Sequence, residues 1–478
     1  MTAGGGPLEP DANGMRALLA NVSERIVREL EALPAQRASD TEGGQAVALK
    51  VREPLPEQGR NADDVFDLVF GELLSKGYNT ASAGTLSYVT GGGLFHSAVG
   101  ELIAAATNRY VAYWAASPGL AELEHTVIRW FCDIVDYPES AGGVLLSGGS
   151  MANLTALVAA RRSRIKGDFS KATLYTSDQV HHSVQKSVVI AGFAEDALRI
   201  LPSDASYRLS PTLLSEAVER DRRDGRVPLA VVATAGTTNS GAVDDLSALA
   251  AVCKEQDLWL HVDAAYGGFF ALTERGRAVL AGIELADTVV LDPHKSLFLP
   301  FGTGCLLAKD VRLLERSHQL HSEYIHAAVE LGDAAGARNF GDLSAEMSRS
   351  ARGLRVWLPM KLLGAQAFRD ALDEKLDLAR HAARELEQME GYDVLGPPVL
   401  STVVFRARLP GQSGSEQDDL NRRILDRVNH WGRVHLSATR LDERFTLRIC
   451  VLSFRTHRDT IATCLAELRR ALAVEREV

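Results

Sequence analysis

The stretch LDPHKSLFLPFGTG, residues 291–304, places Lys295 between an apolar run and a glycine-rich turn. Lysine side chains usually lie on solvated surfaces, because burial of an ammonium group is costly. A lysine that interrupts an otherwise apolar segment therefore needs a chemical reason. Removal from water would lower the pKa of its amine and make it a nucleophile toward carbonyl groups. We expect Lys295 to have such a depressed pKa.

Short apolar runs and amphipathic helical patterns alternate around this stretch, from about residue 85 to residue 360. Apolar runs with few charges are typical of strands that are buried on both faces. They cover 144–147, 173–177, 229–234, 258–263 and 288–292. The helical patterns between them include 151–165, 211–223 and 245–256. This alternation predicts a mostly parallel sheet whose ligands bind beyond the carboxyl ends of the strands.

The segment GGVLLSGGSMANL, residues 142–154, has the pattern of a strand, a tight turn and a helix. Gly148 and Gly149 permit close backbone approach, and Ser150 and Asn153 add polar groups near the helix N-terminus. The free N–H groups and the dipole of such a terminus favour one phosphate group. The pattern is neither GxGxxG nor GxxxxGK[ST], so it does not indicate NAD or ATP. A tight turn without a ligand is the alternative.

Asp263 ends the run LWLHVD, where a buried acid needs a cationic or hydrogen-bonding partner. It either caps a neighbouring helix or keeps a heteroaromatic nitrogen protonated. A phosphate-binding turn, this acid and Lys295 together match the phosphate, the pyridine nitrogen and the aldehyde of pyridoxal 5′-phosphate (PLP). The sequence therefore predicts PLP as the cofactor.

Composition narrows the class of protein. The chain has 478 residues and a formal net charge of −10, which argues against nucleic acid or an anionic membrane surface as partner. The five cysteines are dispersed, without a CxxC pair or a Cys/His metal cluster, as is typical of reduced thiols in a cytoplasmic protein. The N-terminus lacks a signal-peptide pattern, and no apolar run approaches the roughly 20 residues that span a bilayer.

Three regions follow one another along the chain. Residues 1–84 carry helical patterns over 15–33 and from about 61 to 76, joined by a polar, proline-punctuated segment. We expect this region to be a dimerisation arm that docks on a second subunit; docking on its own domain is the alternative. Residues 85–364 are expected to form the large cofactor-binding domain, and residues 365–478 a small C-terminal α+β domain.

Six motifs occur in a familiar order: WAASP with ELE after it (114–124), LSGGSMANL, SDQVHHSV (177–184), VVATAGTTNSGAVDD (231–245), WLHVDAAYGG and DPHKS. In these motifs, over at least residues 85–365, the chain resembles the group II PLP-dependent amino-acid decarboxylases. That family includes the aromatic-L-amino-acid, histidine and glutamate decarboxylases. The resemblance implies the aspartate-aminotransferase-like (type I) α/β fold: a mostly parallel seven-stranded sheet, a helical N-terminal arm and a small α+β C-terminal domain.

The resemblance also implies roles for single residues. Lys295 would form the Schiff base with PLP, and Asp263 would pair with the pyridinium nitrogen. His181, rather than the adjacent His182, would stack on the cofactor ring. The other cofactor-binding residues that it implies are Ser150, Met151, Thr238, Ala265 and His294.

Four more residues concern the substrate and the proton. Tyr324 matches the mobile-loop tyrosine that protonates the substrate Cα in this family; an ordinary helix tyrosine is the alternative. Tyr88 and Thr90 lie where the aromatic decarboxylases form part of the substrate pocket. For Arg448 a structural salt bridge is favoured over the substrate-carboxylate clamp of aminotransferases.

The expected reaction is decarboxylation of an L-amino acid, with an aromatic substrate favoured, through an external aldimine and a quinonoid to the amine and CO₂. The alternatives are a carbon–carbon lyase resembling sphingosine-phosphate lyase and an aminotransferase. We expect a cytoplasmic homodimer with its active site at the subunit interface and no metal. Asp292 is expected to orient His294 or to cap a turn, and Ser296 has no explanation from the sequence.

Overall fold

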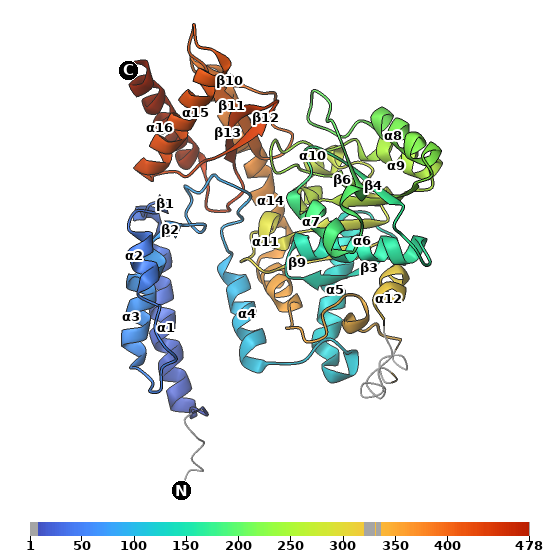
Figure 1. Ribbon diagram of the computed structural model, residues 1–478. Helices are drawn as coiled ribbons and strands as arrows, with labels where there is room; N and C mark the ends of the chain where they lie inside the picture. The colour runs from blue at the N-terminus through green and yellow to red at the C-terminus, as the bar shows by residue number, and fades with distance from the viewer. Residues whose placement is uncertain (1–7, 320–329, 331–335, 478) are drawn as a thin grey trace.

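The computed structural model describes residues 8–319, 330 and 336–477. Tyr324, the expected proton donor, lies outside these residues. At the centre is a seven-stranded sheet with the strand order β3-β9-β8-β7-β6-β4-β5 (Figure 1). Its strands are β3 (Gly142–Leu146), β4 (Ala172–Ser177), β5 (Leu198–Leu201), β6 (Val227–Thr234), β7 (Trp259–Asp263), β8 (Thr288–Leu291) and β9 (Gly304–Ala308).

The predicted mostly parallel arrangement is confirmed. Every neighbouring pair from β5 to β8 is parallel, and β9 runs antiparallel to both β3 and β8. Asp263 at the end of β7 pairs in register with Thr234 of β6 and Val290 of β8. This register brings the carboxyl ends of three strands to one edge of the sheet. The short helix α11 (Pro293–Ser296), which carries Lys295, follows β8 at that same edge.

Helices flank the sheet, and those expected over 151–165, 211–223 and 245–256 are confirmed to within two residues at each end. The helices of this part of the chain are α4 (Phe95–Thr107), α5 (Pro118–Ile134), α6 (Gly149–Arg164), α7 (His182–Ile190), α8 (Pro211–Arg223), α9 (Leu246–Glu255), α10 (Glu274–Val279) and α12 (Arg312–His318). Strand β9 had no counterpart among the expected strands, because a five-residue run after a glycine turn has too little periodicity to be recognised.

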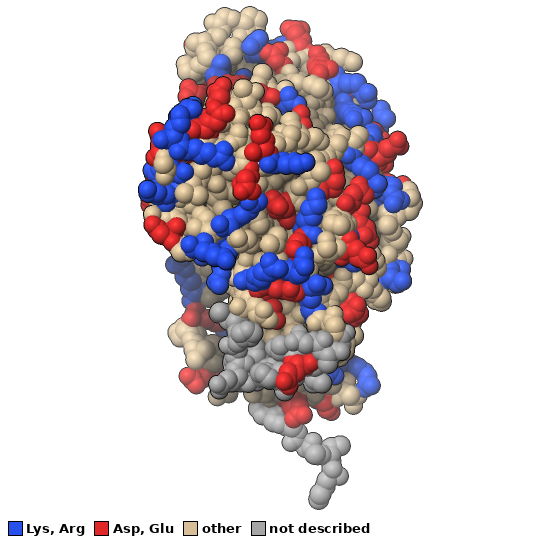
Figure 2. Space-filling view, turned by 90° about the vertical axis from the view of Figure 1, so that its right-hand side faces the viewer, with Lys and Arg blue, Asp and Glu red and all other residues tan. Residues whose placement is uncertain are grey.

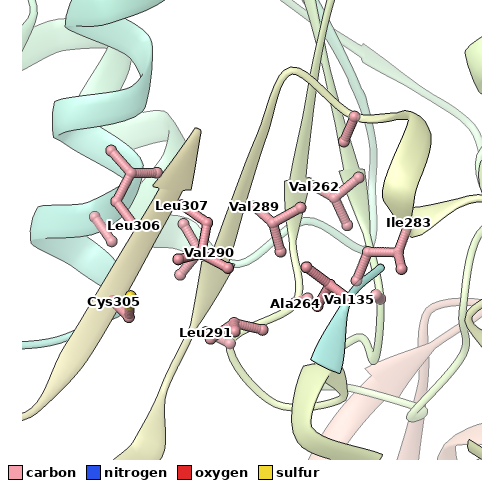
Figure 3. Packing of buried hydrophobic residues seen from close by; sticks show 14 of the residues in the cluster. Val135, Val262, Ala264, Ile283, Val289, Val290, Leu291, Cys305, Leu306 and Leu307 are labelled. Atoms are coloured by element: carbon pink, nitrogen blue, oxygen red, sulfur yellow. The ribbon is translucent and has the colours of Figure 1, made fainter. Parts of the chain in front are cut away.

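Strands β8 and β9, which precede and follow the helix of Lys295 in the chain, contribute to the main core. Figure 3 shows Val289 and Leu291 of β8 together with Cys305 and Leu307 of β9. Val289 is paired with Leu307 and Leu291 with Cys305 across the two strands, and all four side chains are fully buried. Burial of one large apolar side chain contributes roughly 1.5–3 kcal/mol. This packing makes the strands on both sides of the Lys295 helix a rigid support.

A second, antiparallel sheet forms in the C-terminal part, with the order β10-β11-β13-β12. Its elements are β10 (Tyr392–Val394), β11 (Thr402–Ala407), α15 (Gly414–Trp431), β12 (Ser437–Leu441), β13 (Arg444–Cys450) and α16 (Arg458–Arg476). The long helix α14 (Gly353–Glu387) connects it to the main body and is interrupted at Gly364, where φ is 75° (Figure 1).

The N-terminal helices stand beside the main body as a separate bundle (Figure 1). They are α1 (Ala12–Ala32), α2 (Gly44–Leu49) and α3 (Ala62–Gly71), with the short strands β1 (Ser39–Asp40) and β2 (Gly77–Tyr78) at the end of the bundle nearest the C-terminal part. The two expected helices are confirmed, although the second ends at Gly71 and continues only as a 3₁₀ turn. Neither α1 nor α3 contains a buried residue. Their apolar side chains are therefore at most partly covered within the described part of this chain.

Charged side chains of both signs are interleaved over the face of the molecule in Figure 2. Many charged side chains of the described residues form ion pairs, such as Arg275 with Asp373 at 2.7 Å. Across the part of the chain that the structure describes, no helix combines the length and the apolar character that crossing a bilayer requires.

Candidate active site

A cavity of about 330 Å³ lies at the carboxyl ends of β6, β7 and β8. Eight of the predicted residues line it: Ser150, Met151, His181, Thr238, Asp263, Ala265, His294 and Lys295. Distant segments supply them, because the parallel register brings the ends of these strands and the start of α6 together. His182, the competitor of His181, is exposed and does not line the cavity.

The turn between β3 and α6 forms one wall. A Cβ atom on Gly149 would lie 2.9 Å from Asp292 Oδ2 and 3.2 Å from Ala265 Cβ, and one on Gly148 would lie 3.2 Å from His294 Cε1. Glycine is needed here for that close approach. The first N–H groups of α6 have no acceptor within the helix and, with the positive end of its dipole, suit an anion.

Asp263 is a buried carboxylate that also lines the cavity, only 6% exposed. Its Oδ2 accepts a hydrogen bond from Asn153 Nδ2 at 2.9 Å, and its Oδ1 accepts one from Ala265 N at 3.1 Å. No Lys, Arg or His of residues 8–319, 330 and 336–477 is within ion-pairing distance of it. A buried carboxylate of this kind is stabilised by a cation that a ligand brings, such as a protonated ring nitrogen.

Lys295 faces the cavity with 23% of its side-chain surface exposed, and its Nζ lies 3.0 Å from Oδ2 of Asp292. Burial by itself lowers the pKa of Lys295, but the nearby charges of Asp292 and Asp263 outweigh it and raise the pKa above its ordinary value. The expected depressed pKa is therefore wrong for the amine without a cofactor. The lysine at this position is a paired ammonium group, because a buried carboxylate lies beside it.

Asp292 and His294 are close but not directly hydrogen-bonded, with Oδ2 and Nε2 3.6 Å apart. His294 Nδ1 donates to the carbonyl oxygen of Thr303 at 2.6 Å, which fixes the ring. Burial lowers the pKa of His294. The side chain of Asp292 makes no capping hydrogen bond to α11, so its main partner is Lys295.

His181 is the N-cap residue of α7. Its Nδ1 accepts a hydrogen bond from the backbone N–H of Ser183 at 3.3 Å and lies 2.7 Å from the Ser183 hydroxyl oxygen. Burial lowers the pKa of His181. Because a backbone N–H can only donate, the neutral ring carries its proton on Nε2.

Tyr88 and Thr90 do not line the cavity of the single described chain. Tyr88 is 51% exposed and has a positive φ of 52°, whereas Thr90 is buried. The glycine that follows them passes close to the lysine helix: a Cβ on Gly91 would lie 2.4 Å from the carbonyl oxygen of Lys295. The segment therefore supports the site from beside the Lys295 backbone.

Arg448 is a buried residue of strand β13 in the small sheet. Its Nε donates to the carbonyl oxygen of Asn239 and its Nη1 to Ser437 Oγ, both at 2.9 Å. It forms no salt bridge with a carboxylate in the described ranges, and it does not line the cavity there. The favoured salt bridge is therefore not found among these residues, and the arginine instead joins the small sheet to the loop that contains Thr238.

Three residues that the sequence left unexplained or unassigned lie in or beside the cavity. Ser296 is fully buried and its hydroxyl donates to the carbonyl oxygen of Tyr266 at 2.5 Å. Tyr266 also lines the cavity, and its own hydroxyl lies 2.8 Å from Ser401 Oγ. Ser183 was missed as well, and its place after the two histidines was the only available signal.

A helix start that suits an anion, a buried carboxylate with no cationic partner among the described residues and a partly buried amine therefore surround one cavity. These groups fit the phosphate, the ring nitrogen and the aldehyde of PLP. The sheet order and this set of groups define a PLP-dependent enzyme of the aspartate-aminotransferase-like fold.

Comparison with known proteins shows to which family of PLP-dependent enzymes the chain belongs. The pyridoxal-dependent decarboxylase conserved domain matches residues 52–408. An aromatic-L-amino-acid decarboxylase of Bacillus atrophaeus is 33% identical over 470 residues, 98% of this chain and 97% of that protein. An L-2,4-diaminobutyrate decarboxylase of Rhizobium meliloti is 34% identical over 76% of this chain and 72% of its own. The crystal structure of Oryza sativa TDC with PLP and tryptamine has a TM-score of 0.93 at 26% identity and covers 99% of this chain and 100% of that one.

The chain therefore belongs to the pyridoxal-dependent decarboxylase family. It is a carboxy-lyase that uses PLP to remove CO₂ from an L-amino acid.

Proposed function

We propose that the substrate is an aromatic L-amino acid and that the product is the corresponding amine. The observation that carries this proposal is the match to the Bacillus atrophaeus aromatic-L-amino-acid decarboxylase over 98% of the chain. The cavity supports it: in the described part of the chain, no arginine lines it, and Lys295 is its one lysine. An acidic substrate side chain would therefore find no spare cation there.

The roles of single residues form part of this proposal, including that of Tyr324, which lies outside the described residues. PLP, when bound, supplies an electron-withdrawing ring and an aldehyde that reacts with amines. Lys295 binds the aldehyde carbon, Asp263 holds a proton on the ring nitrogen and His181 covers one face of the ring. Tyr324 returns a proton to the substrate Cα after CO₂ has left. The further cofactor contacts are proposed for Ser150, Met151, Thr238, Ala265 and His294.

The cofactor and substrate are tested together. The purified protein should show the visible absorption band of a PLP–lysine linkage, and Lys295→Ala should lose it. A panel of tryptophan, tyrosine, phenylalanine, glutamate and 2,4-diaminobutyrate should yield CO₂ and an amine from the aromatic members. Preference for 2,4-diaminobutyrate would contradict the aromatic assignment. Formation of a keto acid without release of CO₂ would indicate transamination, and it would contradict a purely structural role for Arg448.

We also propose a homodimer in which a second copy covers the N-terminal helices. Met15, Leu18 and Leu19 of α1 are each about half exposed, although they are apolar and lie on a regular 21-residue helix. Such a helix is stabilised by packing of its apolar face on a partner. In this dimer Tyr88, which is also half exposed, and Thr90 complete the substrate pocket. Light scattering should give twice the monomer mass, and Leu18→Glu with Leu19→Glu should reduce it toward one monomer.

The division into residues 1–84, 85–364 and 365–478, together with a cytoplasmic location, completes the proposal. The interruption of α14 at Gly364 supports the second boundary. The five free, buried cysteines support a reducing compartment. Limited proteolysis should cut near these boundaries, and cell fractionation should recover the protein with the cytoplasm.

A further inference from the structure

A chain of buried hydrogen bonds runs through the sheet to Asp263. Trp259 Nε1 donates to Thr288 Oγ1 at 3.0 Å, and the same oxygen lies 2.8 Å from His261 Nδ1. His261 Nε2 lies 2.9 Å from Asn153 Oδ1. Asn153 Nδ2 in turn donates to Asp263 Oδ2 at 2.9 Å. All five of these side chains are buried. Apart from Asp263, His261 is the member of this series that can gain or lose a proton near neutral pH.

The two ends of this chain determine its direction. Asp263, as a carboxylate, only accepts, so the amide nitrogen of Asn153 faces it and the amide oxygen faces His261. His261 Nε2 must therefore carry a hydrogen. Burial lowers the pKa of His261 to about 4, so the ring is neutral and its Nδ1 accepts from the Thr288 hydroxyl. At the far end the indole of Trp259 can only donate. Every hydrogen bond thus points toward Asp263.

A branch of the same chain reaches His181. The second amide hydrogen of Asn153 is directed to Ser183 Oγ at 3.2 Å, and that hydroxyl lies 2.7 Å from His181 Nδ1. Because Nδ1 already accepts from the backbone N–H of Ser183, the Ser183 hydroxyl also donates to it. The amide of Asn153 has all three of its groups in use. One side chain therefore holds both the carboxylate and the imidazole of the cavity.

We propose that Asn153 and His261 are positioning residues of the cofactor site. His261 fixes which way the Asn153 amide is turned, and Asn153 orients Asp263 and His181 as one unit. A buried polar chain of this length is costly when it is only partly satisfied, so a purely structural core would favour apolar side chains here. This inference rests on the cofactor roles proposed for Asp263 and His181.

Titration of the apoprotein with PLP tests the proposal. Asn153→Leu and His261→Phe should each raise the dissociation constant at least about tenfold, the effect of one lost hydrogen bond to a charged group. Because both belong to one chain, the double variant should be no weaker than the weaker single variant. His261→Gln, whose amide can still donate to Asn153, should recover most of the affinity.

Asn421→Leu is the matched control. Asn421 is 1% exposed and bonds to both backbone groups of Ala407, far from the cavity. Asn421→Leu should lower the melting temperature as much as Asn153→Leu does, yet leave the dissociation constant for PLP within about twofold of the wild-type value. Dissociation constants within twofold of the wild type for both Asn153→Leu and His261→Phe would overturn the proposal.

A second measurement does not depend on the cofactor. In apoprotein with ¹⁵N-labelled histidine, His261 and His181 should both carry their proton on Nε2, with His261→Gln and His181→Gln for assignment. A proton on Nδ1 of His261 in the wild type would contradict the proposed series of hydrogen bonds from Trp259 to Asp263. This result would be decisive even if Asn153→Leu failed to fold. Wild-type apoprotein that bound no PLP would instead refute the proposed function, while the proton positions would still decide whether the chain exists.

Discussion

Lys295 Nζ lies 3.0 Å from the Oδ2 atom of Asp292, three positions earlier in the chain, and makes no such contact with Asp263. Asp292 is 2% exposed, and its Oδ1 has no hydrogen-bond partner among the described residues. The pair keeps the free amine charged inside the protein. Asp292 is therefore the counter-ion of Lys295 when no cofactor is attached, whereas Asp263 remains available to a ligand.

Asp292→Asn should lower the pKa of Lys295 in the apoprotein, because it removes the carboxylate nearest to the amine. The pH dependence of Lys295 acetylation by acetic anhydride, followed by mass spectrometry of the peptide, measures this change. Asp310→Asn, which breaks a surface pair with Arg312, is the control and should leave the profile unaltered. An unchanged profile in Asp292→Asn would remove Asp292 as the counter-ion.

Loss of one partner of the buried Arg349–Glu124 pair should cost about 3–5 kcal/mol in the free energy of unfolding, because the other charge stays buried. The two groups are 2.6 Å apart and at most 1% exposed, and Arg349 also donates to the carbonyl oxygen of Leu145 in β3, the strand before the glycine turn at the start of α6. Urea unfolding of Glu124→Gln and Arg349→Met measures the cost. Arg312→Met, which breaks an exposed pair, should cost less than about 1 kcal/mol.

Stability of the apoprotein should fall between about pH 6.5 and about pH 4 because of His261. Burial lowers the pKa of His261 to about 4 in the folded protein from its ordinary value of 6.5, so over this range the unfolded chain binds the extra proton. The stabilisation is present above pH 6.5 and is lost as the pH falls through the folded pKa. His261→Gln should flatten this part of the curve. Melting temperatures of the wild type and of His261→Gln, measured from pH 4 to pH 8, test this prediction. Identical slopes for the two proteins would contradict the assignment of the pH dependence to His261.

Gly91→Ala should displace the backbone that carries Lys295, because its Cβ would come within 2.4 Å of the Lys295 carbonyl oxygen and 2.8 Å of Phe298 Cα. We expect at least about a tenfold loss of PLP affinity, equivalent to about 1.4 kcal/mol, with a lower melting temperature. Gly119→Ala is the matched control, since nothing lies within 4 Å of its Cβ, and should leave both unaltered. Wild-type affinity for PLP in Gly91→Ala would show that the backbones of Gly91 and Lys295 can move apart without disturbing the site.

Local sequence patterns predicted five strands of the main sheet and three features of the cavity, namely the glycine turn, Asp263 and Lys295, whereas the roles of His181, Thr238, Ala265 and His294 came from the resemblance to the decarboxylase family. Alternating apolar runs and helices predict parallel strands, and parallel strands place their carboxyl ends at one edge. Asp263 and Lys295 each follow such a run, so their meeting could be anticipated without coordinates. The glycines before Ser150 likewise predicted a backbone that lies close to its neighbours, as the contacts of Gly149 confirm.

What only the tertiary structure decided was the partner of each charged or polar group. Lys295 pairs with Asp292, Arg448 bonds to a backbone oxygen and a serine, and Asn153 joins residues from separate segments. Local periodicity records which side chains are buried, but it holds no information on distances between segments far apart in the chain. Hydrogen bonds and charge interactions depend on those distances to within a few tenths of an ångström, which only the packed sheet and its helices determine.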